Sequence, residues 1–146
     1  MAKFVYRMQN ILDIKQKLES QAKITYGLAA QRFAEEQQKL QELMIRRMRY
    51  EKALRQMMEG PLNLKEIHNA KSDVTMIKTL VRAQTIKTRR AEAQMNDARR
   101  ALNEVMQERK IQEKLKEKAF EEFKREIAAQ EAKEIDELVS YTYNGN

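Results

Sequence analysis

Apolar residues recur along most of the chain in steps of three, four or seven, which is the spacing of one face of an α-helix. Before residue 60 the series comprises Phe4, Met8, Ile11, Leu18, Ala22, Ala29, Phe33, Leu40, Met44, Leu54 and Met58. After it the series comprises Ile67, Ala70, Val74, Ile77, Val81, Thr88, Ala91, Met95, Ala98, Leu102 and Val105. The pattern predicts one helix over about residues 4–58, a second over about 64–138, and a frayed tail over 139–146.

A single break separates the two series, at Gly60 and Pro61. Glycine is favoured just past a helix end, and proline cannot continue the helix. Asn63 is a suitable N-cap, and Glu66, three residues later, completes a capping box. A turn of about residues 59–63 is short enough to make the helices antiparallel. The predicted fold is therefore all-α, a two-helix antiparallel coiled-coil hairpin forming a single domain over residues 1–146.

The antiparallel pairing predicts that the second helix is longer than its partner. With the turn near residue 60, Phe4 faces roughly Glu117, and about twenty residues of the second helix overhang the first. We expect the apolar residues of this overhang to lack a partner within the chain, which indicates a docking surface. These residues are Phe120, Phe123, Ile127, Ile135 and Leu138.

The composition agrees with long helices and a narrow apolar seam. The 146 residues include three glycines and one proline, 35% are charged, and only 6% are aromatic. No cysteine is present, so no disulfide or thiol chemistry is expected. No apolar run approaches the ~20 residues of a membrane-spanning helix, and no signal-peptide pattern opens the sequence. We expect a cytosolic protein without a membrane-spanning segment.

The charge is unevenly distributed along the chain. Residues 1–110 hold 23 Lys and Arg against 13 Asp and Glu, whereas residues 111–146 hold 6 against 9. The basic part suggests two kinds of partner, nucleic acid or an anionic membrane surface. However, acids are interspersed, and no aromatic residues alternate with the basic ones to stack bases. A solvated helix face is the preferred interpretation, and no nucleic-acid partner is expected.

The sequence contains no recognisable active site. Its one histidine, His68, belongs to the predicted second helix near the turn, and no phosphate-binding glycine motif occurs. Carboxylates such as Glu121, Glu122 and Glu126 form no convergent pocket on one helix. We therefore predict a protein that is not an enzyme, with no catalytic residue, cofactor or metal.

Both ends of the sequence carry motifs that are similar to those of a known family. The first motif is residues 4–15 (FVYRMQNILDIK), and the others are residues 113–123 (EKLKEKAFEEF) and 131–138 (EAKEIDEL). Together with the length and the single break, they resemble the bacterial flagellar export protein family FliJ. Some members have an aromatic residue where Asp73 stands, and there the sequence departs from the family.

The resemblance implies a stalk or adaptor of the flagellar type III export apparatus. In that family the end carrying both termini enters the hexameric export ATPase FliI and promotes its assembly and activity. The hairpin end reaches the export gate protein FlhA, and the protein also handles export chaperones. The implied location is the cytoplasmic face of the inner membrane at the flagellar base, with peripheral association.

Two sets of contact residues follow from this resemblance. The implied ATPase-binding set is Phe4, Arg7, Ile11, Leu12, Phe120, Phe123, Ile135 and Leu138. The implied gate-binding set is Met44, Met48, Ile77, Leu80, Val81 and Gln84. The alternatives left open are a general cytosolic coiled-coil chaperone or scaffold and, in a different class, a basic nucleic-acid-binding protein.

Overall fold

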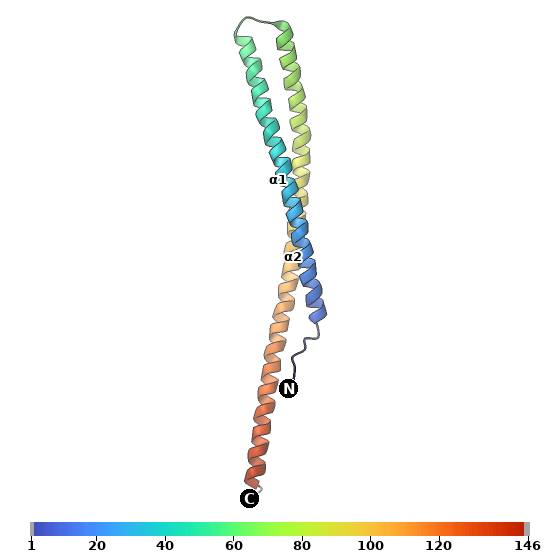
Figure 1. The fold of residues 1–146 in the computed structure, drawn as a ribbon, viewed down its shortest axis with the longest axis vertical. Coiled ribbons are helices and arrows are strands. Elements are labelled where there is room, and N and C mark those ends of the chain that lie inside the picture. Colours follow the sequence, from blue (N-terminus) through green and yellow to red (C-terminus); the bar gives the residue numbers. More distant parts are fainter. Residues whose placement is uncertain (1, 145–146) are drawn as a thin grey trace. The chain divides into compact units, whose positions relative to one another are not determined.

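The computed structural model describes residues 2–144, and every regular element in that range is an α-helix. Helix α1 is Gln9–Glu59 and helix α2 is Leu64–Asn144 (Figure 1). The two helices pack against each other in antiparallel directions, so the predicted all-α helical hairpin is confirmed. The chain groups into two compact units, each described separately below. One unit joins the chain up to Gln21 with the chain from Asn103 onward, and the other is Ala22–Leu102.

The helix bounds differ from the predicted ones at both outer ends. Helix α1 begins at Gln9 rather than near Phe4, and its first turn is anchored on the Met8 carbonyl, which accepts hydrogen bonds from Ile11 and Leu12 at 3.0 and 3.1 Å. Helix α2 continues to Asn144 instead of fraying after residue 138. No glycine or proline interrupts the sequence between Leu64 and Asn144, so nothing local ends the helix earlier. The single domain over residues 1–146 stays a prediction.

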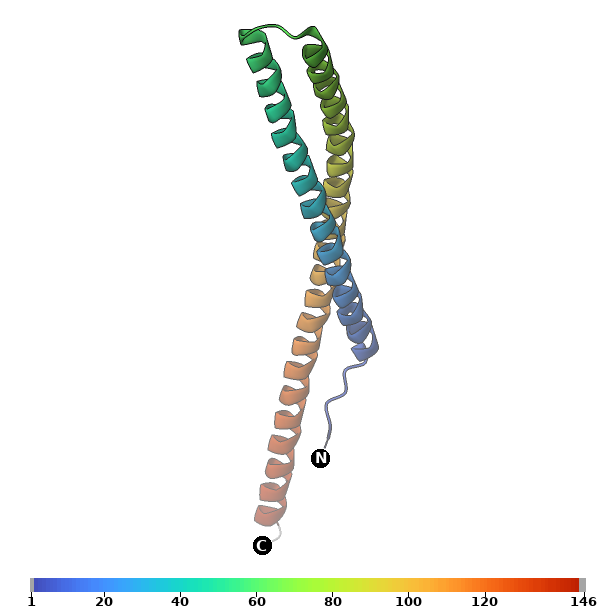
Figure 2. The same cartoon turned by 45° about the horizontal axis from the view of Figure 1, so that its top comes forward.

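Asn63 is the N-cap of α2, as the sequence predicts, and one of the two bonds of the predicted capping box is present. The Asn63 side-chain oxygen accepts a hydrogen bond from the Glu66 amide at 3.3 Å, and its carbonyl accepts one from Ile67 at 3.0 Å. These bonds satisfy donors that the first turn of a helix leaves free. Figure 2 shows the short irregular segment that joins the two helix ends. Among the described residues no glycine has a positive φ, so Gly60 ends α1 without a left-handed cap.

In the Ala22–Leu102 unit, one stripe of α2 forms the buried side of the seam. Its members follow each other in alternating steps of three and four, the spacing of a coiled-coil core, and Ile77 is 0% exposed. The buried positions are Ile67, Ala70, Val74, Ile77, Val81, Gln84, Thr88 and Ala91. All seven members of the predicted series from Ile67 to Ala91 are therefore in the observed core, and Gln84 is buried with them.

The stripe of α1 that faces the seam differs from the predicted one by a single position in several places. Ile11, Leu18 and Met44 are about two-fifths to half exposed, while Leu12 and Glu19 are buried. Two apolar residues are often adjacent in α1, so the apolar pattern does not fix which of them faces α2. Polar residues take several of the inward positions instead. The sequence prediction of the α1 stripe was therefore partly wrong.

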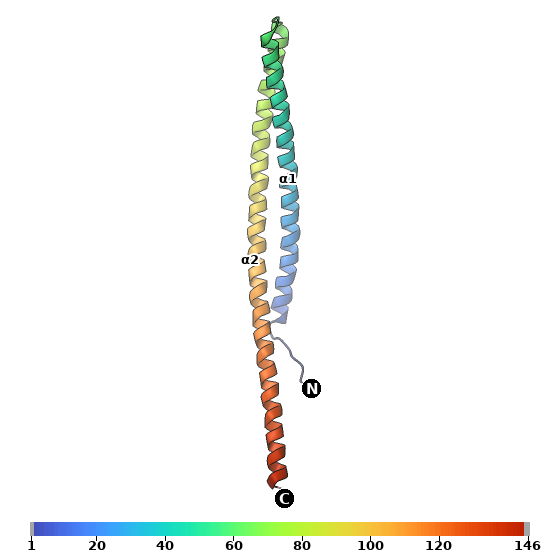
Figure 3. The same cartoon turned by 90° about the vertical axis from the view of Figure 1, so that its left-hand side faces the viewer.

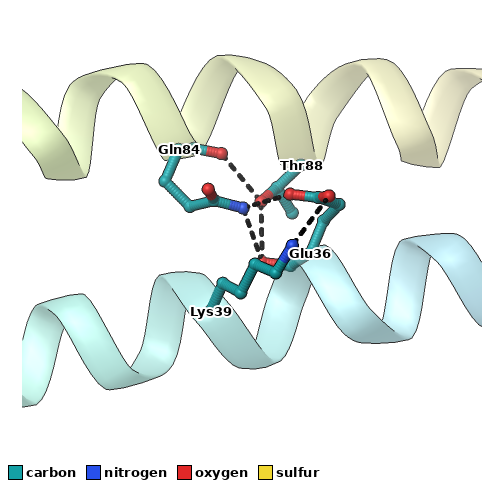
Figure 4. A network of polar contacts seen from close by, with 4 residues as sticks. All are labelled: Glu36, Lys39, Gln84 and Thr88. Carbon is teal, nitrogen blue, oxygen red and sulfur yellow. Dashed lines mark hydrogen bonds and ion pairs between the residues drawn. The ribbon is translucent and has the colours of Figure 1, made fainter.

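A layer of polar contacts interrupts the apolar seam in the Ala22–Leu102 unit (Figure 4). The Gln84 amide donates to the backbone carbonyl of Glu36 at 3.0 Å and also to the Glu36 carboxylate. The Thr88 hydroxyl donates to the same carbonyl at 3.2 Å and to the Gln84 carbonyl at 2.8 Å. Lys39 lies 3.5 Å from the other carboxylate oxygen of Glu36. The buried polar groups of α2 thus obtain partners from a single turn of α1, as burial requires.

The same layer perturbs one ionisable group. The hydrogen bond from Gln84 holds the pKa of Glu36 below its ordinary value, and the positive charge of Lys39 lowers this pKa further. Burial of the carboxylate acts in the opposite direction and raises the pKa. A lowered pKa means that the folded chain binds the charged carboxylate better than the protonated acid. The layer therefore stabilises the folded chain at neutral pH.

Replacing Ile77 by Ala tests the seam. Ile77 is 0% exposed, so the substitution is expected to lower the free energy of unfolding by about 2–5 kcal/mol. Ile86→Ala is the matched control, because Ile86 is 53% exposed and its loss is expected to change stability by no more than about 0.5 kcal/mol. Urea denaturation followed by circular dichroism measures both. Equal losses in the two variants would contradict the assignment of the core.

Glu36→Gln tests the polar layer through pH. Because the pKa of Glu36 is lowered in the folded chain, its stabilising effect is present above the ordinary glutamate value of 4.5 and is lost as the pH falls below it. Glutamine cannot titrate, so the variant lacks this component. We expect the variant to melt below the wild type at neutral pH and the difference to shrink on acidification. A difference in melting temperature that stays constant through this range would contradict the prediction.

Candidate protein-docking site

An aromatic cluster joins the residues before α1 to α2 in the unit that contains both termini. The ring of Phe4 lies edge-on to Phe120 with centroids 5.1 Å apart, and 5.5 Å from the ring of Phe123. The Lys124 ammonium lies 4.5 Å from the centroid of the Phe120 ring. Phe4 is not helical, so these ring contacts, and not a helix, fix its position.

We call residues 2–8, which precede α1 and are not helical, the extended segment. A second contact holds this segment on α2. The Tyr6 hydroxyl donates to the side-chain oxygen of Gln112 at 3.2 Å. Beside it lies a hollow of about 470 Å³, lined mostly by apolar surface. Its walls are Phe4, Leu12, Gln16, Glu113, Lys116, Glu117 and Phe120. The prediction that Phe4 faces roughly Glu117 agrees with this lining.

Charged residues fix how the first turns of α1 sit on α2 in this unit. The Arg109 guanidinium donates to the carboxylate of Glu19, which is only 6% exposed, and to Glu113 at 2.8 Å. Lys15 pairs with Glu108 at 2.7 Å. Glu113 and Glu19 together raise the pKa of the Arg109 guanidinium above its ordinary value. The Arg109 group therefore carries a positive charge that bridges the two helices.

Past these contacts α2 continues without α1 beside it (Figures 1 and 3). Ile127 is the last residue of α2 with a partly buried side chain, and every side chain from residue 128 to residue 143 is exposed. The large apolar side chains in this range are 60% to 83% exposed. They are Ile135, Leu138, Val139, Tyr141 and Tyr143. We call residues 128–143 the free segment of α2.

The free segment continues the stripe that contacts α1 further up the helix. From Phe120 onward the positions 123, 127, 131, 135, 138 and 142 follow in steps of three and four, so they share one side of the helix. Glu131 is its one charged member. The segment as a whole holds four acids against one lysine, a balance of −3. The free segment therefore carries an apolar stripe on an acidic stretch of helix.

The structure separates the ATPase-binding set of residues into three groups. Ile135 and Leu138 are 60% and 65% exposed, and Arg7 is exposed as well. Leu12 is only 2% exposed, so it forms part of the seam. Phe120 and Phe123 were expected to lack a partner within the chain, and this was wrong because Phe4 contacts both rings. The extended segment before α1 supplies that partner, which a prediction of an uninterrupted helix from Phe4 could not anticipate.

The gate-binding set divides between the seam and the surface. Ile77, Val81 and Gln84 are at most 7% exposed, so they contact α1 in this structure and present almost no surface. Met44, Met48 and Leu80 are 47%, 67% and 40% exposed. Only these last three are available to another molecule without opening the seam.

The sequence prediction missed three exposed residues near the end of α2. Val139, Tyr141 and Tyr143 are 62%, 79% and 83% exposed, and they extend the free segment to the end of the described helix. The assumption of a frayed tail after residue 138 excluded them. The signal was present in the spacing, because Val139 and Tyr143 follow Ile135 in steps of four.

Two other kinds of site, a membrane span and a metal centre, are absent from residues 2–144. Neither helix includes a stretch that is both long and apolar enough to cross a bilayer. The same residues contain no group of three or more His, Cys, Asp or Glu side chains placed to hold a metal ion.

The fold and the free segment define a class: a helical hairpin with an exposed apolar stripe on the last turns of its second helix. A model of the family described as Flagellar FliJ protein matches residues 4–146, essentially the whole chain. The chain belongs to the FliJ family and is thus a component related to flagellar export. No curated protein and no solved structure matches the chain closely enough to count as a relative.

Phe4→Ala tests whether the ring contacts hold the extended segment. Each ring pair contributes about 0.5–1.5 kcal/mol, so losing both is expected to release the segment and speed tryptic cleavage after Lys3 and Arg7 about tenfold. Peptide mapping over time measures the cleavage. Val5→Ala is the control, because Val5 is 80% exposed and its loss should leave the rate unchanged. Equal rates in the two variants would show that the rings do not hold the segment.

Proposed function

We propose that this chain is a stalk or adaptor of the flagellar export apparatus that binds the hexameric export ATPase FliI, promotes its assembly and activity, and links it to the export gate protein FlhA and to export chaperones. Family membership supports the setting. The observation that carries the ATPase contact is the free segment of α2, whose apolar stripe has no α1 beside it.

An exposed apolar stripe on a helix favours docking into a groove of another protein. A helix in a groove is anchored by side chains at spacings of three and four, and the free segment supplies Ile135, Leu138 and Val139 at such positions. These residues are each about three-fifths exposed, so much of their apolar surface is still available for burial. The anchoring energy of the proposed contact therefore comes chiefly from this stripe.

Charge adds a requirement on the partner. The free segment carries a balance of −3, so a groove that receives it gains from basic residues at its rim. Arg7, on the extended segment, supplies a charge of the opposite sign to the same end of the molecule. The proposed ATPase surface is thus apolar at its centre and predominantly basic at its edge.

The remaining members of the ATPase-binding set take different parts in this proposal. Ile11 is 39% exposed and can contribute directly, whereas Leu12 supports the surface from within the seam. Phe4, Phe120 and Phe123 form one partly exposed aromatic cluster that the partner would meet as a unit. For the gate, Met44, Met48 and Leu80 are the proposed contacts, because the other three predicted residues are buried.

Peripheral association with the cytoplasmic face of the inner membrane completes the proposal. It follows from the proposed contact with the gate. The type III secretion in this proposal is that of the flagellar export apparatus, and a role in chemotaxis would act through flagellar assembly. Non-catalytic action is part of the same proposal, since a stalk acts through its contacts.

Truncation after Ile127 tests the ATPase contact. The removed side chains are exposed as far as residue 143, so the remaining helices are expected to melt as in the full chain. Because anchor residues commonly contribute 2 kcal/mol or more each, loss of the stripe is expected to abolish co-elution with FliI and stimulation of its ATPase activity. Normal stimulation by the truncated chain would place the contact elsewhere.

A pair of double variants refines the test without shortening the chain. Ile135→Ala with Leu138→Ala is expected to weaken FliI binding by at least about 30-fold, the equivalent of one anchor. Ile24→Ala with Leu28→Ala is the matched control, because these residues are 65% and 64% exposed on α1. The control should bind as the wild type does. Equal weakening in both would indicate a general effect of apolar surface and contradict a specific stripe.

A further inference from the structure

The turn between the helices carries large apolar side chains that contact little of the protein. Met58, Leu62 and Leu64 are 56%, 64% and 78% exposed, and they come from the end of α1, the turn itself and the start of α2. A solvated turn needs none of these residues, since turns favour small and polar side chains. The end of the hairpin therefore presents a convex apolar tip, which we define as Met58, Leu62 and Leu64.

A basic helix face leads up to this tip. A hollow of about 490 Å³ on α1 is lined by Ile45, Met48, Arg49, Glu51, Lys52 and Arg55. Ile45, Met48, Lys52 and Arg55 follow in steps of three and four, so they lie on one side of α1. The opposite side of α1 packs on α2, and Leu43, Arg47, Tyr50 and Leu54 are partly buried there. The face is therefore apolar and cationic at once.

The cations of this face are available to bind an external anion. Arg49, Lys52 and Arg55 are exposed, and none of them forms an ion pair among residues 2–144. By contrast, Arg47 on the inner side is paired with Glu51 at 3.0 Å. Over residues 45–71 the sequence holds seven Lys and Arg against three Asp and Glu, a balance of +4. Basic residues therefore outnumber acidic ones in the sequence both before and after the apolar tip.

We infer that the hairpin tip binds the surface of an anionic phospholipid bilayer, with Leu62 and Leu64 entering the headgroup region and Arg49, Lys52 and Arg55 binding lipid phosphates. Apolar side chains beside unpaired cations are the combination that interfacial membrane binding uses. Each basic residue near an anionic leaflet adds attraction, and each apolar group adds insertion.

A bilayer fits this surface better than a protein groove does. The exposed apolar groups lie on three successive elements, the end of α1, the turn and the start of α2, whereas a helix-binding groove receives one regular helix. A fluid headgroup layer adapts to a convex tip, and its phosphates match the net positive charge. The inference goes beyond the proposed function, and vesicles without any protein partner test it separately from the ATPase and gate contacts.

The test uses two fluorescent probes on the cysteine-free chain. Gly60→Cys and Gly27→Cys each accept a side chain, because a Cβ added at either glycine meets nothing within 4 Å. Each variant is labelled with the environment-sensitive dye NBD and mixed with vesicles of phosphatidylcholine, with or without phosphatidylglycerol. We expect a blue shift of the residue-60 probe on phosphatidylglycerol vesicles, no shift of the residue-27 probe, and little binding to phosphatidylcholine alone.

Two sets of substitutions separate insertion from simple charge attraction. Leu62→Ser with Leu64→Ser is expected to abolish the blue shift at residue 60 and weaken vesicle binding about tenfold, with the charge unchanged. Arg49→Gln, Lys52→Gln and Arg55→Gln together should weaken binding about tenfold more than the matched control on α2. That control replaces three exposed cations of the same types, Arg82, Lys87 and Arg89, by Gln.

Four outcomes would overturn the inference. Absence of wild-type binding to phosphatidylglycerol vesicles would remove the lipid and leave an acidic protein as the partner of this surface. Equal shifts of both probes, or binding that the serine variant retains in full, would show adsorption by net charge alone. Equal weakening by the two triple variants would show that the tip has no special part.

Discussion

The structure depends on one constraint: a helix can bury its apolar stripe only where a second helix lies beside it. In the Ala22–Leu102 unit α1 and α2 satisfy this constraint, and α2 buries eight residues in steps of three and four, with Ile77 fully enclosed. A seam of this kind is one residue wide, so the protein has a narrow apolar core and most side chains remain in water. Surface that would be interior in a globular domain is here available for contacts with other molecules.

The same constraint explains the part of α2 that lies past the first residue of α1. Before α1 begins, the extended segment covers α2. The contacts of the Phe4 ring with Phe120 and Phe123 take the place of the missing helical partner. Beyond Ile127 no other part of the described chain covers α2, yet its stripe continues through Ile135 and Leu138. A helix of this length without Gly or Pro has no local reason to end earlier. The cost of exposing the stripe is the free energy that a docking partner would recover on burial.

Much of the fold could be predicted because its determinants are local. The break at Gly60 and Pro61, the Asn63 cap and the α2 stripe all follow from residue type and spacing. The start of α1 could not be predicted in this way, because ring contacts between residues more than one hundred positions apart decide it. The α1 stripe was displaced for a similar reason. Where two adjacent residues are both apolar, the partner helix selects the inward one, and that information lies in α2.

The candidate site was predictable to a comparable degree, and for the same reason. Exposure of Ile135 and Leu138 follows from chain lengths on either side of a short turn, whereas burial of Ile77, Val81 and Gln84 follows from the seam itself. The residues taken from the family resemblance alone include both exposed and buried ones. A position within a coiled coil can be conserved in type for packing or for contact, and only the register of the two helices separates these roles.

Register is therefore the property on which any function of the free segment depends, and buried polar groups define it more sharply than apolar ones do. Leucine packs acceptably against several neighbours, but Gln84 and Thr88 need the acceptors that the turn around Glu36 provides. In the unit with both termini, Glu19 needs a cation at the depth where Arg109 lies, and Lys15 needs Glu108. A shift of one helical turn would leave buried polar groups unsatisfied, which costs more than lost apolar contact. In the unit with both termini, the pairs of Arg109 with Glu19 and of Lys15 with Glu108 determine which residue of α2 is the last to lie beside α1, and hence where the exposed stripe begins.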